Sequence, residues 1–117
     1  MELTIADIIN LNRSLDGIAK QKMKASLAIQ FNKLKQECTP HLNEAEETRL
    51  KLVKEYGKEN ESGNVAVTEE NAVKFFEEYK ATLTRTVKLK ADKLPIDALD
   101  SIELSPEDAA GFLPLMD

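Results

Sequence analysis

The feature that most constrains this chain is one apolar stripe that keeps its phase on both sides of a proline. Its members lie three or four residues apart, the spacing of one face of an α-helix: Phe31, Leu34, Cys38, Leu42, Ala45, Arg49, Leu52 and Tyr56. Pro40 interrupts the stripe, and a proline inside a helix removes a backbone hydrogen bond and crowds the preceding turn. The unbroken phase predicts one long, kinked helix over residues 23–57. The alternative is a break, with Pro40 in the first turn of a separate helix.

The residues before the long helix predict a short first helix within residues 1–20. Thr4 is placed to cap it, and Asp7 stands at the third helical position, where an acid favours the helix dipole. Its apolar residues recur at helical spacing and form a broad face: Ile5, Ile8, Ile9, Leu11, Leu15 and Ile18. We expect this face to be buried in a core and not to lie on a membrane, because the polar side is not rich in Lys or Arg.

A third helix is expected over residues 68–83, folded back on the long helix as an antiparallel hairpin. Gly57 suits the end of a helix, and the polar sequence KENESGN suits a turn. Thr68 is placed as the N-cap of the third helix. Its predicted buried face consists of Ala72, Val73, Phe76, Tyr79 and Leu83.

Residues 84–117 are predicted to hold a short strand, a loop and a terminal helix. The period changes here from helical to alternating, with Val87 and Leu89 on one side of the strand. A lone strand cannot satisfy its backbone groups, so we expect its partner in residues 65–67, in residues 102–104, or in a second copy. The sequence SPED begins the terminal helix, and FLPLMD is left as an exposed tail.

These elements predict a mainly α fold: a long helical hairpin with a short N-terminal helix and a small C-terminal β element. A length of 117 residues suits a single domain, residues 1–117, with one core. Hydrophobic residues make up 42% of the chain and tryptophan is absent, so we expect a core of Leu, Ile, Val and Ala.

Charge is distributed unevenly along the chain, whose net charge is −5. Residues 1–58 hold 10 basic and 8 acidic residues, whereas residues 59–117 hold 6 and 13. The negative balance argues against nucleic acid as a partner, because neutralising phosphates needs a basic surface. One run of lysines without acids suits contact with a phosphate backbone or with an acidic partner, although such lysines more often only cover a helix surface: Lys20, Lys22, Lys24, Lys33 and Lys35.

A homo-oligomer is predicted because three features need a partner. The third helix is too short to cover the whole long helix. The strand has an open edge, and the lysine run attracts the acids that follow Leu94. A second copy in a two-fold or ring-like contact would meet all three needs, through the long helix and the C-terminal segment.

Cys38 and His41 are the only cysteine and histidine of the chain, and Glu44 follows at the same helical spacing. Structural zinc sites normally use four ligands, mostly Cys and His, and no second such pair exists. Cys38 lies in the apolar stripe, where cysteine usually behaves as a small hydrophobe. Glycine-rich phosphate loops and metalloprotease motifs are also missing. We therefore expect no metal, no cofactor, no catalytic residue and a non-enzymatic function.

The chain has the features of a cytoplasmic protein. One cysteine cannot form an internal disulfide, and MELTIADIIN has neither the basic start nor the apolar run of a secretory signal. No apolar stretch approaches the roughly 20 residues that span a bilayer. We expect a protein that works in a reducing cytoplasm, without contact with a membrane.

Five segments, in their order along the chain, resemble parts of a known group of proteins: LTIADIINLNRSL, RLKLVKEYGKENESGN, VKFFEEYKATL, VKLKADKLPIDAL and LSPEDAAGFLPLM. The group consists of small uncharacterised helical proteins encoded by tailed bacteriophages and prophages. The resemblance covers nearly the whole chain and rests on layout and on apolar and turn positions. It supplies no catalytic motif. It implies a protein that acts in the cytoplasm of an infected bacterial host or in the phage virion.

The expected function is binding of another protein, viral or host, as a virion component or assembly factor. The helical hairpin offers surface, and the apolar tail offers a docking peptide. The expected partner-binding residues are therefore the lysine run together with Phe112, Leu113, Leu115 and Met116. The alternative is a small acidic inhibitor of a host enzyme or defence protein, which would imitate the charge of nucleic acid.

Overall fold

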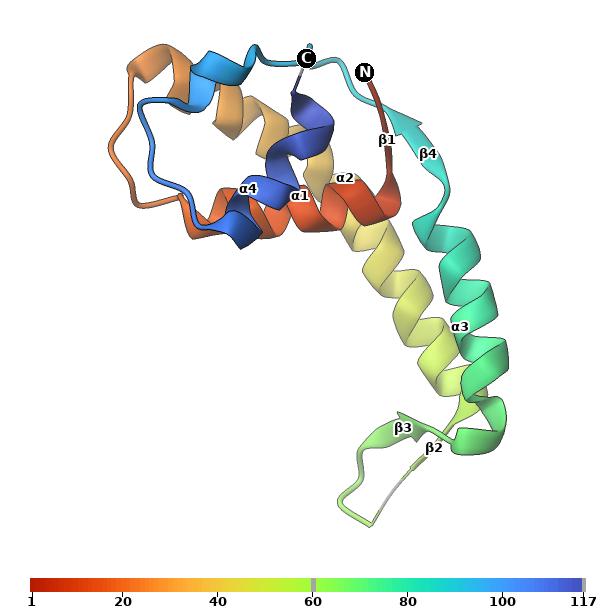
Figure 1. Cartoon of the computed structure of the whole chain (residues 1–117). Helices are drawn as coiled ribbons and strands as arrows, with labels where there is room; N and C mark the ends of the chain where they lie inside the picture. The colour runs from red at the N-terminus through yellow and green to blue at the C-terminus, as the bar shows by residue number, and fades with distance from the viewer. Residues whose placement is uncertain (60, 117) are drawn as a thin grey trace.

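The structure, a computed structural model, describes residues 1–59 and 61–116 and is mainly helical (Figure 1). Its elements in chain order are β1 (Glu2–Thr4), α1 (Ile5–Gly17), α2 (Ala25–Tyr56), β2 (Gly57–Glu59), β3 (Val65–Val67), α3 (Glu69–Leu83), β4 (Thr86–Lys88), the 3-10 helix η1 (Ile96–Leu99), α4 (Pro106–Phe112) and the 3-10 helix η2 (Leu113–Leu115). The predicted class, mainly α with a minor β component, is confirmed.

Helix α2 runs the length of the molecule. Its 32 residues span about 48 Å at 1.5 Å per residue, close to the longest dimension of the protein, 50 Å. Pro40 lies inside this one helix. The predicted continuity through Pro40 is confirmed, and the alternative of a break there is wrong. The predicted stripe supplies most of the buried face, which consists of Leu27, Phe31, Leu34, Cys38, Ala45 and Leu52.

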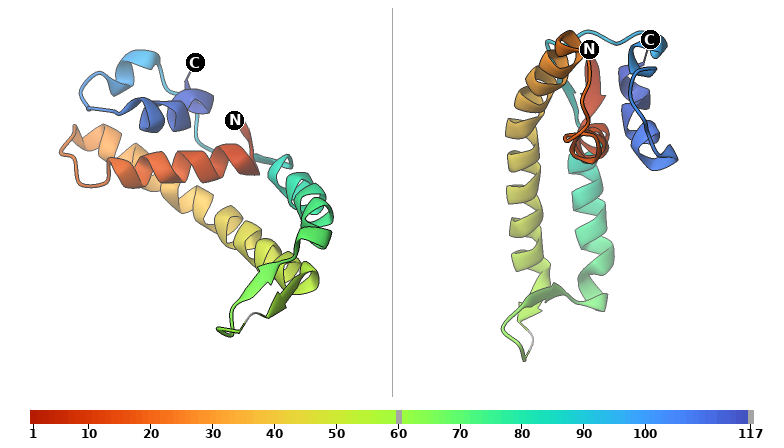
Figure 2. Two further views of the ribbon diagram at one scale, coloured as in Figure 1. Left: turned by 60° about the horizontal axis from the view of Figure 1, so that its bottom comes forward. Right: turned by 90° about the vertical axis from the view of Figure 1, so that its left-hand side faces the viewer.

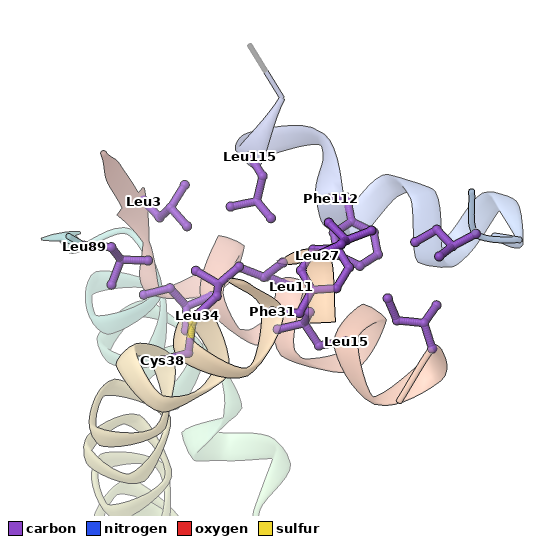
Figure 3. Close-up of a cluster of buried hydrophobic side chains, with 13 residues drawn as sticks. Leu3, Leu11, Leu15, Leu27, Phe31, Leu34, Cys38, Leu89, Phe112 and Leu115 are labelled. Carbon is purple, nitrogen blue, oxygen red and sulfur yellow. The ribbon is translucent and has the colours of Figure 1, made fainter. Parts of the chain in front are cut away.

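The core lies around the N-terminal half of α2, in a part of the molecule that we call the head (residues 1–42 and 86–116). Helix α1 lies between α2 and α4 (Figure 2). The rings of Phe31 and Phe112 are 5.6 Å apart between centroids and join α2 to the C-terminal segment. The main buried cluster belongs entirely to the head (Figure 3): Leu3, Ile8, Leu11, Leu15, Ile18, Leu27, Phe31, Leu34, Cys38, Leu89, Ile102, Phe112 and Leu115.

Helices α1 and α4 approach each other closely at Gly111. A Cβ atom at this position would lie 1.9 Å from Ser14 Oγ and 2.6 Å from the backbone oxygen of Asn10. Gly111 is buried. Only a residue without a side chain fits this crossing, so Gly111 sets the distance at which α4 packs on α1.

The N-terminal residues form the partner of the predicted strand. Strand β1 pairs antiparallel with β4, and Leu3 lies opposite Val87. Beyond the strands the ladder continues, because Leu89 N–H donates to the Met1 carbonyl oxygen at 2.8 Å. The two partners expected within the chain, residues 65–67 and 102–104, are wrong, since residues 2–4 pair with this strand. Residues 65–67 do form a strand, but β3 pairs with β2 in a separate hairpin.

The C-terminal half of α2, β2, β3 and α3 form a thin projection that we call the hairpin arm (residues 43–59 and 61–85). Helix α3 packs beside α2, and the β2–β3 turn lies at the far end (Figures 1 and 2). The radius of gyration is 17.0 Å, whereas a compact chain of this length has about 13 Å. The predicted helical hairpin is present, and it extends well outside the main core.

Helix α3 buries only part of its predicted face: Ala72, Tyr79 and Leu83 are half-buried, but Val73 and Phe76 are not. Phe75 is its buried residue, whereas Val73 and Phe76 are exposed. Two adjacent phenylalanines define two apolar stripes about 100° apart on a helix, and a hairpin of two helices buries only one of them. The Phe75 ring packs edge-on against Tyr79, with centroids 5.8 Å apart.

Polar contacts hold the arm at its two ends. The Tyr56 hydroxyl donates to Glu78 Oε1 at 2.7 Å, and this hydrogen bond raises the pKa of Tyr56 to about 12. At the base, Arg85 Nη2 lies 3.2 Å from Glu44 Oε1. Thr68 is the N-cap residue of α3 as predicted, but its side chain makes no capping hydrogen bond. Its hydroxyl is buried without a partner in the described part of the chain.

Two of the three needs that predicted a homo-oligomer are met within one chain. Helix α1 and the C-terminal segment cover the part of α2 that α3 does not reach, and β1 covers the strand edge. Among the described residues, the lysine run contributes one ion pair, between Lys35 and Asp16 of α1. Self-association through the long helix and the C-terminal segment stays a prediction.

Candidate functional site

A groove with an apolar floor runs between the N-terminal half of α2 and the segment 90–95. It has a volume of about 610 Å³, within the range of sites that bind small molecules or short peptide segments. Phe31 and Leu34 from α2 and Leu115 from η2 belong to its lining. The full set of lining residues is Gln30, Phe31, Lys33, Leu34, Gln36, Glu37, Lys90, Ala91, Asp92, Lys93, Leu94, Pro95 and Leu115.

The segment 90–95 is held as the second wall of the groove by two hydrogen bonds. Strand β4 ends at Lys88, and Leu89 is the last fully buried residue before the chain crosses α2. The backbone N–H of Lys90 then donates to Glu37 Oε1 at 2.6 Å. Leu94 N–H donates to the Leu115 carbonyl oxygen at 2.7 Å. Both ends of the wall are thus fixed, one to α2 and one to the C-terminal segment.

The rim of the groove carries a small excess of positive charge. Three lysines line it, Lys33, Lys90 and Lys93, against two acids, Glu37 and Asp92. Glu37 already accepts a backbone hydrogen bond, which uses part of its capacity. All three lysines are exposed. An apolar floor with cationic side chains at its edge suits a segment that has an apolar anchor beside acidic residues.

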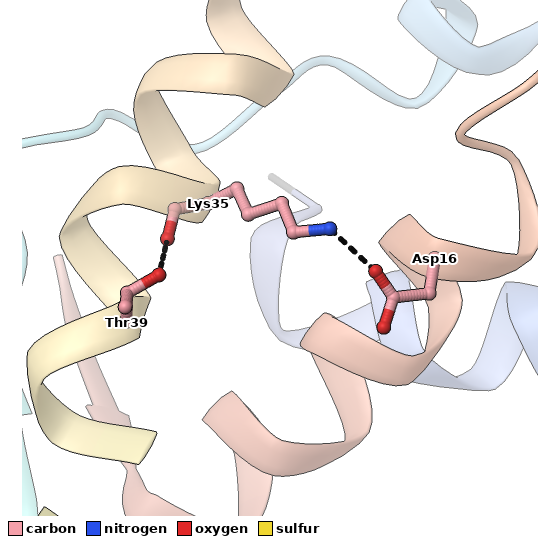
Figure 4. A network of polar contacts seen from close by, with 3 residues as sticks. All are labelled: Asp16, Lys35 and Thr39. Carbon is pink, nitrogen blue, oxygen red and sulfur yellow. Dashed lines mark hydrogen bonds and ion pairs between the residues drawn. The ribbon is translucent and has the colours of Figure 1, made fainter. Parts of the chain in front are cut away.

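The predicted lysine run is divided between several places. Lys33 lines the groove, whereas Lys20, Lys22 and Lys24 are exposed in and beside the connection between α1 and α2. Lys35 points to α1, where its Nζ lies 2.5 Å from Asp16 Oδ1 (Figure 4). Both side chains of this ion pair are largely exposed, so it adds little to stability. The run is therefore not one basic surface.

The predicted docking tail is folded into the head. Phe112 and Leu115 are 0% and 1% exposed, so neither is available as an anchor for a partner. Met116 is half-buried and forms an isolated bridge with Leu94. Leu113 alone remains open, at 67% exposure. The expectation of an exposed apolar tail is wrong, because α1 and α2 present an apolar surface that the tail itself covers.

Sequence reasoning missed the residues of the second wall. Lys90 lies at the end of the alternating segment and Lys93 after it, and no local pattern gives either a reason to meet Lys33. A signal was nonetheless present in KADKLP, where Asp92 and Pro95 end the alternating pattern and predict an irregular segment. The place of that segment against α2 depends on packing that no local pattern contains.

Cys38 and His41 are separated by burial. Cys38 is completely buried in the core, while His41 is partly exposed. Burial, with a contribution from Glu37, raises the pKa of the Cys38 thiol to about 11, which disfavours the reactive thiolate. Within residues 1–59 and 61–116, no three Cys, His, Asp or Glu side chains are grouped as metal ligands. The groove lining offers ammonium, carboxylate and amide groups.

Comparisons of this chain with known protein families, with curated proteins and with solved structures find no match. In the part of the chain that the structure describes, no helix combines the length and the apolar character needed to cross a bilayer.

Proposed function

We propose that the protein is a non-enzymatic bacteriophage protein that works by binding another protein in the groove beside α2. Its role in this proposal is that of a virion component or assembly factor. The observation that carries the binding role is the groove itself, which joins an apolar floor to a rim of three lysines. The phage setting comes from the resemblance of the chain's layout to small phage proteins.

The proposed occupant is an extended, acidic segment of the partner with one large apolar side chain. The apolar side chain would lie on Phe31, Leu34 and Leu115, and burying it contributes about 1.5–3 kcal/mol. Acidic residues on either side would meet Lys33, Lys90 and Lys93. Such rim contacts add mainly to the association rate and to selectivity, and they weaken as salt is raised.

Site-specific photo-crosslinking during infection tests this proposal. A photoreactive amino acid at Gln36, an exposed residue of the groove lining, should crosslink to one partner protein. The same group at Lys51, exposed on the hairpin arm, is the matched control. Replacing Lys33, Lys90 and Lys93 by glutamate should remove the Gln36 crosslink, whereas glutamate at Lys51 should not.

The identity of the crosslinked protein decides the role. A capsid or tail protein, with this chain present in purified particles by mass spectrometry, supports a virion component. A crosslink to a viral protein, with this chain absent from purified particles, supports an assembly factor. A crosslink to a host enzyme or defence protein supports the alternative of an acidic inhibitor. An identical crosslinking pattern at Gln36 and Lys51 would contradict binding in the groove.

A further inference from the structure

The outward side of α3 carries two large apolar side chains that nothing in the described chain covers. Val73 and Phe76 are each 66% exposed. Phe75, the buried residue of α3, lies about 200° around the helix from Val73 and about 100° from Phe76. The Phe76 ring touches only the edge of Phe75 among aromatic neighbours, with centroids 5.4 Å apart. An exposed phenylalanine and valine on one stripe indicate an interaction surface.

Two charged residues continue this stripe at its ends. Glu69, Val73, Phe76 and Lys80 follow one another at spacings of four, three and four residues, so they line one face of α3. Glu69 and Lys80 are exposed, and neither belongs to an ion pair between described residues. The stripe therefore has an acid at its N-terminal end, a base at its C-terminal end and an apolar centre.

This order makes the stripe complementary to itself in the antiparallel direction. When a second α3 lies alongside in reverse with Val73 opposite Phe76 of the copy, the same register places Glu69 opposite Lys80 of the copy. A two-fold axis then repeats both pairs. Two apolar contacts at the centre and two ion pairs at the ends follow from one alignment, with no like charges opposed on the stripe.

We propose that the protein forms a two-fold dimer through antiparallel pairing of α3 with α3 of a second copy. A membrane surface is a poorer occupant, since the adjacent Glu70 and Glu77 would be repelled by anionic lipid. The dimer leaves the groove of each copy free, because the groove lies in the head and α3 lies in the hairpin arm. The dimer would present two grooves, which could bind two copies of the partner held close together.

The size of this surface sets the expected affinity. Helix α3 has 15 residues and is about 22 Å long, so the contact falls at the small end of specific interfaces. We expect a dissociation constant on the order of 10 µM, as for weak, reversible complexes. The dimer, with its two grooves, would then form only where the local concentration of this protein is high, as on a phage particle.

Sedimentation equilibrium from about 1 to 500 µM tests the dimer, with circular dichroism as a check on folding. The wild-type chain should change from 13.1 kDa to twice that mass over this range. Phe76→Asp should raise the dissociation constant by more than tenfold and leave the helix signal unchanged, because Phe76 is exposed in the monomer. Lys74→Glu, on another side of α3, is the matched control and should dimerise like the wild type.

A charge exchange tests the register. Glu69→Lys and Lys80→Glu should each weaken the dimer severalfold by placing like charges opposite each other, and the double variant should recover most of the affinity. Equal effects of Lys74→Glu and Lys80→Glu, or no recovery in the double variant, would overturn the proposed pairing. A protein that stays monomeric at 500 µM in low salt would overturn the dimer, while the groove crosslink would be unaffected by that result.

Discussion

Gly111 is the residue at which the structure makes its sharpest energetic prediction. In Gly111→Ala, the new Cβ would stand 2.6 Å from a backbone oxygen, that of Asn10, which cannot move without distorting α1. It would also stand 1.9 Å from Ser14 Oγ. Two responses are open to the protein: α4 stays in place under strain, or the C-terminal segment leaves the head.

The response that costs less free energy determines how much stability is lost. Overpacking a close contact typically costs about 1–3 kcal/mol and occasionally more. Releasing the segment exposes Phe112 and Leu115, which are fully buried, at about 1.5–3 kcal/mol each. The upper bound is therefore roughly 3–6 kcal/mol, and we expect Gly111→Ala to lower the free energy of unfolding by about 3 kcal/mol.

Gly17→Ala is the matched control, because it adds the same methyl group on α1 near the same crossing. Its Cβ would meet the Asp108 carboxylate at 2.8 Å, the end of a side chain that can turn away. Alanine is also the better helix former. We expect the free energy of unfolding of this variant to stay within about 1 kcal/mol of the wild type.

Urea denaturation followed by circular dichroism measures both variants, and limited proteolysis reports whether residues 106–115 have come loose. Equal midpoints for Gly111→Ala and Gly17→Ala would refute the argument that α4 packs against backbone at this point. Loss of stability without faster cleavage near the C-terminus would show that strain is retained and the segment stays bound.

Three further predictions concern single side chains. Pro40→Ala should raise the free energy of unfolding by up to about 3 kcal/mol, because the regained N–H completes an exposed turn of α2; an unchanged or lower urea midpoint would contradict this. Thr4→Val should cost about 1 kcal/mol by removing the hydroxyl that accepts from Asp7 N–H, whereas Thr68→Val should cost nothing, since that hydroxyl has no partner; equal losses would refute the distinction. Burial raises the Cys38 thiol pKa from 9.0 to about 11, so its contribution to stability is complete below pH 9 and is lost as the pH rises to 11; urea midpoints at pH 8 and 10.5 should fall less in Cys38→Ala than in the wild type.

The sequence predicts the helices well because one signal reports both helical period and burial. The apolar stripe keeps its phase on both sides of Pro40, and the structure has a single helix there. Cys38 and Ala45 are buried, as their places in the stripe predict. On α3 the same signal is right for Ala72, Tyr79 and Leu83 and wrong for Val73 and Phe76. There Phe75 and Phe76 are adjacent, and hydrophobicity alone does not say which of them faces α2.

The head was harder to predict because its parts come from distant segments. Strand β1 has three residues and one buried side chain, Leu3, which is too little for a periodic signal. The tail residues Phe112 and Leu115 are apolar whether they bind a partner or their own head. The groove likewise exists only after Lys33 and Lys90 have been brought together by tertiary packing.

The division into head and hairpin arm also imposes an order on folding during synthesis. The arm joins α2 to the next helix along the chain, so its contacts can form as soon as residue 85 has left the ribosome. The head cannot close then, because α1 is translated long before its cover, α4. For most of translation the apolar faces of α1 and of the first half of α2 therefore await residues 106–115. A nascent chain that stalls before those residues would keep these faces exposed, in the form most prone to aggregate or to be held by a chaperone.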